Sequence, residues 1–177
     1  MDALAPFRIP ISALKADSDS FQWEIGPDFF ARFDGDHQPP RGNFKVAMDL
    51  ERTGLLVTLD FNVKGILQTT CDRCMVPIEM KLENEFQLIV KFGNPDESTD
   101  EVIYVDPESA GLNVGQSIYD FILLSIPISH RIPNCETMDN PPCDMSIVNY
   151  LNENKVEEVN PEEQNLLWDQ LRKAIDN

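Results

Sequence analysis

Four cysteines are the residues whose type and spacing could support chemistry in this chain. Cys71 and Cys74 form a CxxC turn, and Cys135 and Cys143 form a wider pair much later in the sequence. A structural zinc site needs four converging thiolate or imidazole ligands, and a CxxC turn supplies two of them together. This pattern predicts a zinc site made by the four cysteines.

Three other interpretations of the cysteines stay open at this point. Cys71 and Cys74 also suit a strand end as small core residues. They could be a redox pair, although the strand–helix unit that carries thioredoxin-like CxxC motifs is missing here. Cys135 and Cys143 could lack any joint role, because their wide spacing does not make a compact metal-binding knuckle.

Three further side chains are candidates for contact with a partner protein or RNA. Arg73 lies inside the CxxC turn, where it could bind a phosphate or carboxylate or could balance the nearby acids Asp72 and Glu79. His130 and Arg131 follow the end of an expected helix. A lone histidine in such a place is more often a cap or a surface residue than an acid–base group.

Enzyme motifs are missing from the sequence. It contains no phosphate-binding loop, no GxGxxG, no HExxH and no GxSxG. With two histidines and no activated nucleophile, a hydrolase triad is improbable. We therefore expect a protein that is not an enzyme.

The charge of the chain is strongly negative. Its 177 residues carry 31 Asp and Glu against 14 Lys and Arg, for a net charge of −17. Proteins that bind nucleic acid by neutralising phosphates need a basic face, and these bases do not form an evident one. The acidity is explained by solubility or by attraction to a basic protein partner.

No stretch of the sequence is apolar and long enough to span a membrane. The first residues lack the positive segment and apolar run of a secretory signal. We expect a cytoplasmic protein without membrane contact, in which the cysteines are thiols or metal ligands rather than disulfides.

Apolar residues at every second position predict a β-rich first part. The alternation covers residues 7–11, 21–25, 44–51 and 57–63, and a turn at Gly54 makes a hairpin. A further strand is expected over residues 66–70. It resumes after Pro77, with a bulge or turn expected near Asn84. Phe29, Phe30 and Phe33 predict a helical turn that packs inward.

Two helices are expected in the second part. The first begins at Asn113, with Gln116 completing a capping box, and ends at Pro127. Residues 130–160 predict an ordered loop or arm, and Pro161 starts the second helix. The fold class is α+β: an antiparallel β-rich core domain with one central helix over residues 1–130, and an acidic, loop-rich tail ending in a short helix over 131–177.

Two motifs together resemble those of the YceD family, the large ribosomal RNA subunit accumulation proteins. They are the turn Cys71-Asp72-Arg73-Cys74-Met75 and the helix end Leu123-Leu124-Ser125-Ile126-Pro127. The segments Phe7–Ile11 and Val90–Gly93 look like the Bacteroidota-type version. The tail departs from many relatives, which have further cysteines where this chain has Asp139–Asp144, and this departure weakens the zinc interpretation.

The resemblance implies a non-catalytic role in ribosome biogenesis, namely support of large-subunit rRNA accumulation. The expected partner is a basic ribosomal or ribosome-maturation protein, with rRNA contacted directly or through it. The alternatives are a direct rRNA-binding module that uses Arg73, Arg131 and nearby aromatic residues, and a zinc- or thiol-dependent enzyme.

Overall fold

Alternation of apolar and polar residues along three long strands produces the main sheet of the protein. The structure is a computed structural model that describes residues 4–10, 18–33, 40–99, 102–109, 111–154 and 168. The chain divides into two compact units, Met1–Pro133 and Asn134–Asn177.

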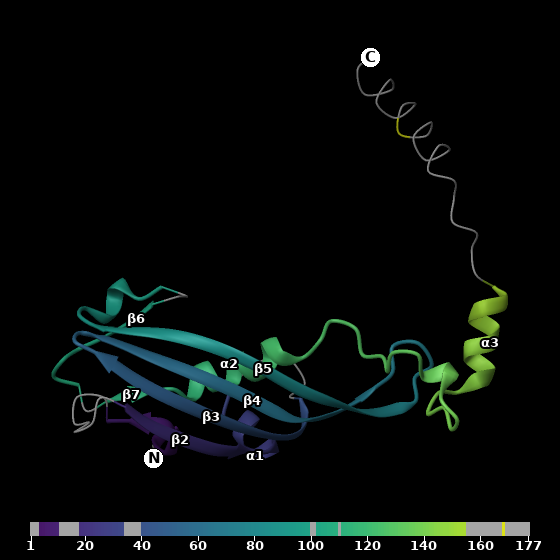
Figure 1. The fold of residues 1–177 in the computed structure, drawn as a ribbon, viewed down its shortest axis with the longest axis horizontal. Helices are drawn as coiled ribbons and strands as arrows, with labels where there is room; N and C mark the ends of the chain where they lie inside the picture. Colours follow the sequence, from purple (N-terminus) through teal and green to yellow (C-terminus); the bar gives the residue numbers. More distant parts are fainter. Residues whose placement is uncertain are drawn as a thin grey trace. The chain divides into compact units, whose positions relative to one another are not determined.

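The first unit contains a five-stranded sheet with strand order β2-β3-β4-β5-β6 (Figure 1). Neighbouring strands are antiparallel except for β5 and β6, which run parallel. A tight turn at Gly54, whose φ of 66° suits glycine, joins β3 to β4. The strands are β2 (Ser18–Ile25), β3 (Arg41–Thr53), β4 (Leu56–Thr70), β5 (Pro77–Phe92) and β6 (Val102–Val105).

One face of the sheet is buried and holds the core. Every second residue of β3 and β4 points into this face, as the period of a pleated strand requires. These residues include Phe44, Val46, Met48, Leu50, Val57, Leu59, Phe61 and Val63, all of them almost completely buried. The antiparallel, β-rich fold expected from the alternation is confirmed.

Helices and a small second sheet cover the buried face. The helix α2 (Gly115–Ser125) buries Ile118 and Ile122, and its Phe121 ring stacks on Phe86 at 4.6 Å. The short helix α1 (Pro27–Phe30) buries Phe29 and Phe30, as expected. The remaining elements of this unit are η1 (Ala5–Phe7), β1 (Arg8–Ile9), η3 (Pro95–Glu97) and β7 (Leu112–Asn113), with β1 paired to β7.

The break expected near Asn84 is wrong. Strand β5 pairs with β4 without interruption from Pro77 to Lys91. Asn84 occupies an inward position, where a polar residue is unusual, and its side-chain amide donates to the carbonyl oxygen of Ser125 at 3.5 Å. The polar residue therefore meets the last turn of α2 instead of interrupting the strand.

The capping box expected at the start of α2 is also wrong. Asn113 belongs to β7, and its side-chain oxygen accepts the N–H of Gly115 at 2.9 Å while its amide donates to Leu4. The Gln116 side chain instead donates to Asp120, one turn further along the helix. Asn113 thus ties β7 and the N-terminal segment to the first residue of the helix.

The second unit contains η4 (Cys135–Thr137) and α3 (Met145–Glu153). Asp144 caps α3 by accepting the backbone N–H of Ser146, and hydrogen bonds from the Ser146 side chain and backbone lower the pKa of Asp144. This helix corrects the expectation of a loop or arm over 130–160. Apart from Trp168, the helix expected after Pro161 lies outside the described residues.

Candidate functional site

The CxxC turn closes the hairpin between β4 and β5. The Cys71 N–H donates to the Val76 carbonyl at 2.8 Å, and the Met75 N–H donates to the Cys71 carbonyl at 2.9 Å. Met75 adopts a positive φ of 58°, which tightens the turn. Cys71 and Cys74 are thiols that take part in no disulfide, and both are buried.

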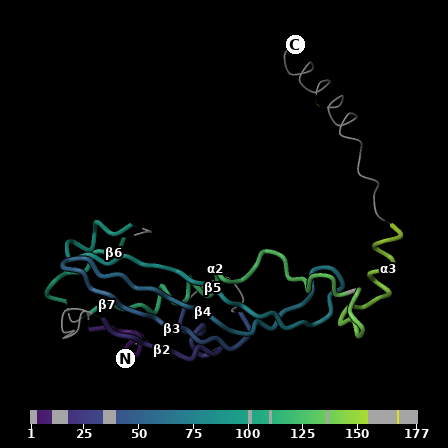
Figure 2. The backbone as a smooth tube through the Cα atoms, in the orientation of Figure 1, coloured from purple at the N-terminus to yellow at the C-terminus, as the bar shows by residue number. Residues whose placement is uncertain are grey.

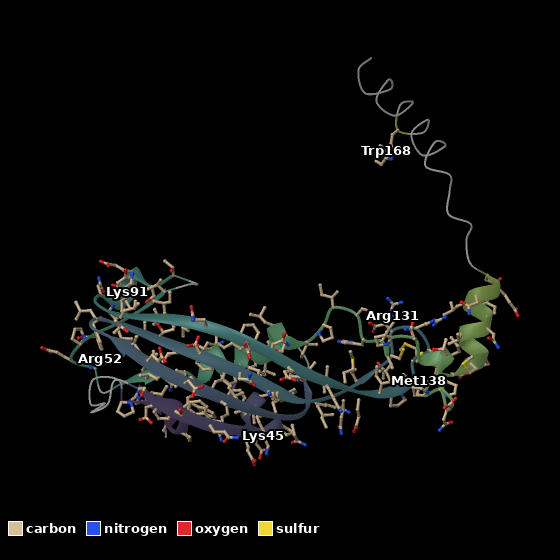
Figure 3. The ribbon with its side chains drawn as sticks, in the orientation of Figure 1. Lys45, Arg52, Lys91, Arg131, Met138 and Trp168 are labelled. Atoms are coloured by element: carbon tan, nitrogen blue, oxygen red, sulfur yellow. A yellow bond between two sulfur atoms is a disulfide. The ribbon has the colours of Figure 1, made fainter. Side chains whose placement is uncertain are left out.

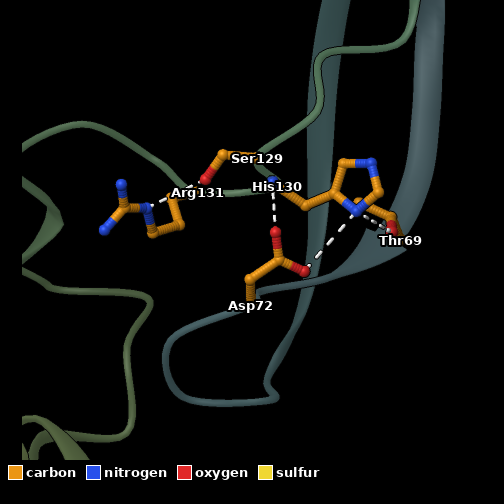
Figure 4. A network of polar contacts seen from close by, with 5 residues as sticks. All are labelled: Thr69, Asp72, Ser129, His130 and Arg131. Atoms are coloured by element: carbon orange, nitrogen blue, oxygen red, sulfur yellow. Dashed lines mark hydrogen bonds and ion pairs between the residues drawn. The ribbon is translucent and has the colours of Figure 1, made fainter. Parts of the chain in front are cut away.

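The segment after α2 is fastened to this turn by a pair of reciprocal hydrogen bonds (Figure 4). The His130 N–H donates to the Asp72 carboxylate at 2.6 Å, and the Asp72 N–H donates to the His130 carbonyl at 2.9 Å. The His130 ring nitrogen Nδ1 lies 3.7 Å from the same carboxylate and 3.5 Å from Thr69 Oγ1. Asp72 therefore holds both the backbone and the ring of His130.

The other ring nitrogen of His130 is a buried polar atom. Within the described part of the chain, Nε2 has neither solvent exposure nor a hydrogen-bond partner. A buried polar atom without a partner costs free energy, about 1–3 kcal/mol in mutational data, unless a water, ion or ligand satisfies it. His130 is consequently the side chain here with the clearest unused binding capacity.

A groove with a volume of about 760 Å³ adjoins His130. It lies between the last residues of β4, the first residues of β5 and the C-terminal end of α2. Its lining is mainly apolar with some polar groups: Pro40, Arg41, Leu67, Gln68, Thr69, Thr70, Pro77, Ile78, Glu79, Leu123, Ile126 and His130.

Two exposed apolar residues are close in sequence to the groove residues Leu123 and Ile126. Leu124 is 70% exposed and Ile128 is fully exposed, although both follow or belong to the helix that fills the core. Contiguous exposed apolar residues on a soluble protein mark interaction surfaces more often than isolated ones do. The groove and its rim can thus accept apolar side chains, with His130 available for a hydrogen bond.

The three partner-contact candidates lie near one another around Asp72. Arg73 is its direct neighbour in the turn, and His130 is bonded to it. The side chain of Arg131 turns toward Ser129, whose hydroxyl oxygen accepts from Nε at 3.1 Å, and points away from the sheet (Figures 3 and 4). The acids Asp72 and Glu79 share this region with the arginines, so its charge is mixed.

The structure separates the four cysteines into two pairs. Cys135 and Cys143 form a disulfide in the second unit, so the expectation of thiols or metal ligands rather than disulfides is wrong for this pair. Cys71 and Cys74 remain thiols in the first unit. Among the described residues, no group of three or more His, Cys, Asp or Glu side chains is arranged to hold a metal ion. The zinc site with Cys71, Cys74, Cys135 and Cys143 as ligands stays a prediction, and it requires the disulfide to be reduced.

Metal analysis of reduced protein tests this prediction. If the four thiolates hold zinc, protein purified with reductant and without chelator contains one equivalent of zinc, and Cys71→Ser and Cys135→Ser each lose it. Thiol counting on the same samples provides the control, because two free thiols together with an intact disulfide would mean that the pairs are separate. Protein that contains no zinc under these conditions would end the hypothesis.

Sequence reasoning missed Asp72, Thr69 and the groove. The available signal was the helix end Leu123-Leu124, because two leucines beyond the core-facing stripe of a helix must either find a second apolar partner or remain exposed. Proximity of His130 to the turn could not be read from the sequence, since the two are far apart along the chain.

Comparison with known proteins gives one match. The family model described as large ribosomal RNA subunit accumulation protein YceD matches residues 59–173, which include the CxxC turn, α2 and His130. No curated protein and no solved structure shows significant similarity to the chain. None of the helices in the described ranges combines the length and hydrophobicity needed to cross a bilayer. Because the match spans more than half of the sequence, the chain belongs to the YceD family.

Proposed function

We propose that this protein is a non-catalytic, cytoplasmic factor that supports large-subunit rRNA accumulation by binding a basic ribosomal or ribosome-maturation protein. Membership of the YceD family supports the role in accumulation of large-subunit rRNA. The net charge of −17 supports the choice of partner, because so acidic a protein attracts cationic surfaces and repels free polynucleotide.

The solvent face of the main sheet carries a small excess of acidic over basic side chains, seven against five. This face comprises the outward residues of β2 to β5, on the side opposite the core, and Figure 3 labels Lys45 and Lys91 on it. Its acidic residues are Glu24, Asp49, Glu51, Asp60, Glu79, Glu83 and Glu85, and its basic residues are Arg41, Lys45, Lys64, Lys81 and Lys91.

Two acids on the solvent face stand directly opposite each other. Asp49 and Asp60 are cross-strand partners in β3 and β4, where like charges destabilise a sheet. Neutral donors reduce this repulsion, since the Ser20 hydroxyl donates to Asp49 at 2.7 Å and the Gln87 amide donates to Asp60 at 2.8 Å. A partner that brings Lys or Arg to this row would relieve the repulsion further.

The basic residues of the solvent face are partly engaged by its acids. Lys64 contacts Glu83 at 2.8 Å, and the hydrogen bond and charge of that carboxylate raise the pKa of Lys64. Lys45 lies 3.5 Å from Glu24. These exposed ion pairs contribute little to stability, but they leave acids in excess toward solvent.

Direct binding to rRNA through Arg73, Arg131 and nearby aromatic residues is the second candidate. The clustering of Arg73 and Arg131 near His130 favours it. The positions of the aromatic residues argue against direct rRNA binding. Phe29 and Phe30 are core residues. Phe33 stacks on Tyr119 at a centroid distance of 4.3 Å, and Trp23 packs near Phe7. Stacking platforms for bases need exposed ring faces.

The buried state of the thiols also speaks against a thiol enzyme. Reactive cysteines lie in accessible, electropositive surroundings, whereas Cys71 and Cys74 are 3% and 2% exposed. Their observed environment suits the alternative in which they are small core residues that stabilise the strand end.

Depletion and affinity capture test the proposed function together. We expect depletion to reduce the mature large-subunit rRNA and the 50S peak in a sucrose gradient, while the 30S peak is preserved. Tagged protein should capture basic proteins that resist nuclease treatment, because protein rather than RNA carries the contact. An unchanged 50S peak would refute the role, and capture that nuclease abolishes would favour direct rRNA binding, whose affinity must then fall steeply with salt.

A further inference from the structure

Most of the outer edge of β5 has no strand beside it in the described part of the chain. Strand β6 pairs only with Ile89–Phe92, at one end of β5 (Figure 2). The preceding residues of β5 pair with β4 on one side only. An open edge of this length is a ready template for an additional strand, and proteins normally shorten, cover or charge such edges.

The direction of the backbone groups follows from the ladder itself. In an antiparallel pair, the residues of one strand alternately face their partner strand and the opposite side. The Cys71 N–H donates to the Val76 carbonyl, so the even-numbered residues that follow in β5 direct their N–H and C=O groups toward β4. The Gly93 N–H donates to the carbonyl of Val105 in β6, which agrees, because odd-numbered residues then direct these groups to the opposite edge. The N–H and C=O groups of Glu79, Lys81, Glu83, Glu85 and Gln87 therefore face the open edge.

These edge-facing groups have no partner within the described residues. No turn, loop or cap hydrogen bond involves the backbone of residues 79–87. Their side chains lie on the solvent face, where three acids, one lysine and one glutamine make the edge acidic. A strand docked here would place alternate side chains opposite these acids, so Lys or Arg would be favoured at those positions.

The other face of a docked strand would meet apolar surface. The inward residues along the same edge include Met80, Leu82 and Phe86, of which Met80 and Phe86 are only half-buried. The groove lined by Ile78, Leu123 and Ile126 lies on this side of the sheet. Alternate positions of an added strand would thus favour apolar residues.

We propose that the β5 edge, residues 79–87, binds an extended segment of a basic partner protein by strand addition, with Lys or Arg alternating with apolar residues. This inference rests on the proposed function for the identity of the partner as a basic protein. Main-chain hydrogen bonds supply affinity in this mode, and the alternate side chains supply specificity. A second copy of this chain is a poorer occupant, because two bodies of charge −17 repel each other.

Hydrogen exchange of individual amides tests the proposal on the full chain. In the free protein, the amides of residues 79, 81, 83, 85 and 87 should exchange fast and those of 80, 82, 84 and 86 slowly. Saturation with a capped peptide of alternating Lys and Val should slow the odd-numbered set at least ~10-fold, because those N–H groups become paired. A peptide of alternating Glu and Val should leave them fast.

A matched pair of variants tests the backbone contact separately from the side chain. Lys81→Pro removes one edge-facing N–H while keeping every bond to β4, and Lys81→Ala removes the same side chain but keeps the N–H. Lys81→Pro should weaken peptide binding at least ~10-fold relative to Lys81→Ala. If Lys81→Pro does not fold, Glu85→Lys, which reverses an exposed charge, should weaken binding of the Lys/Val peptide and Glu51→Lys on β3 should do so less.

Several results would overturn the proposal. They are peptide binding without slowed exchange of the odd-numbered amides, equal protection by the Glu/Val peptide, and slow exchange of these amides in the free protein. Slow exchange in the free protein would mean that another part of this chain already pairs with the edge. If the slow exchange depends on protein concentration, a second copy of the chain pairs with it. Capture of the same nuclease-resistant basic proteins by Lys81→Pro and Lys81→Ala would mean that the edge is not the docking site, while the proposed function stands. Capture of no basic protein by either variant would mean that the proposed function fails.

Discussion

Phe61→Ala should lower the free energy of unfolding by about 3–5 kcal/mol, a large part of the total stability of a domain of this size. Phe61 lies on β4, the middle strand of the sheet, and is 1% exposed. Its ring contacts Phe121 of α2 at a centroid distance of 5.0 Å, and Phe121 stacks on Phe86. Removing it leaves a cavity between the sheet and the helix that rigid strands cannot close.

Urea unfolding followed by circular dichroism measures this effect. The midpoint should fall while the slope stays unchanged, which identifies a change in stability rather than in the unfolded state. Asn62→Ala is the matched control, because Asn62 is the next residue of the same strand, lies on the solvent face and donates to the exposed Glu85. A loss for Phe61→Ala that is no larger than that of Asn62→Ala would contradict the packing of α2 on the sheet.

The same alternation that buries Phe61 made the strands predictable from sequence. A residue on every second position must face the core, so Phe44 to Leu50 and Val57 to Val63 identify both the strands and their buried faces. Alternation gave the wrong prediction where one polar residue on the inward face had a specific hydrogen-bond partner. Asn84 resembles a break in the pattern, yet it is accommodated because the end of α2 offers a carbonyl acceptor.

Contacts between segments that are distant in the sequence could not be predicted from local sequence patterns. Pairing of β1 with β7, and the parallel addition of β6 to β5, join residues whose sequences carry no mark of each other. The candidate site has the same character: the cysteines, Arg73, His130 and Arg131 could be named from residue type, but the bonds between Asp72 and His130 depend on where Pro127 redirects the chain after α2. The groove combines residues from the end of β4, the start of β5 and the end of α2, and only the folded chain brings them together.

Gly65→Ala should destabilise the protein by about 1–3 kcal/mol or more, because the added methyl group has no space. A Cβ atom at Gly65 would lie 2.6 Å from the Asn43 carbonyl oxygen and would overlap the ring of Phe44. Phe44 is the cross-strand partner of Gly65 and lies across it, fully buried. Relief requires β3 and β4 to separate locally, next to the groove residues Arg41 and Leu67.

Gly26→Ala is the matched control, since a Cβ atom there meets only the Asn43 side chain at 3.8 Å. It should change stability by less than about 1 kcal/mol, as expected for a methyl group added without a clash. Gly65→Ala should also speed hydrogen exchange at Lys64 and Ile66 relative to the centre of β4. Equal urea midpoints for the two variants would mean that the Phe44 side chain can move away from Gly65 without loss of stability. In that case the end of the sheet that holds His130 and the groove would be adaptable, and a partner strand at β5 would meet a surface that rearranges rather than one already formed.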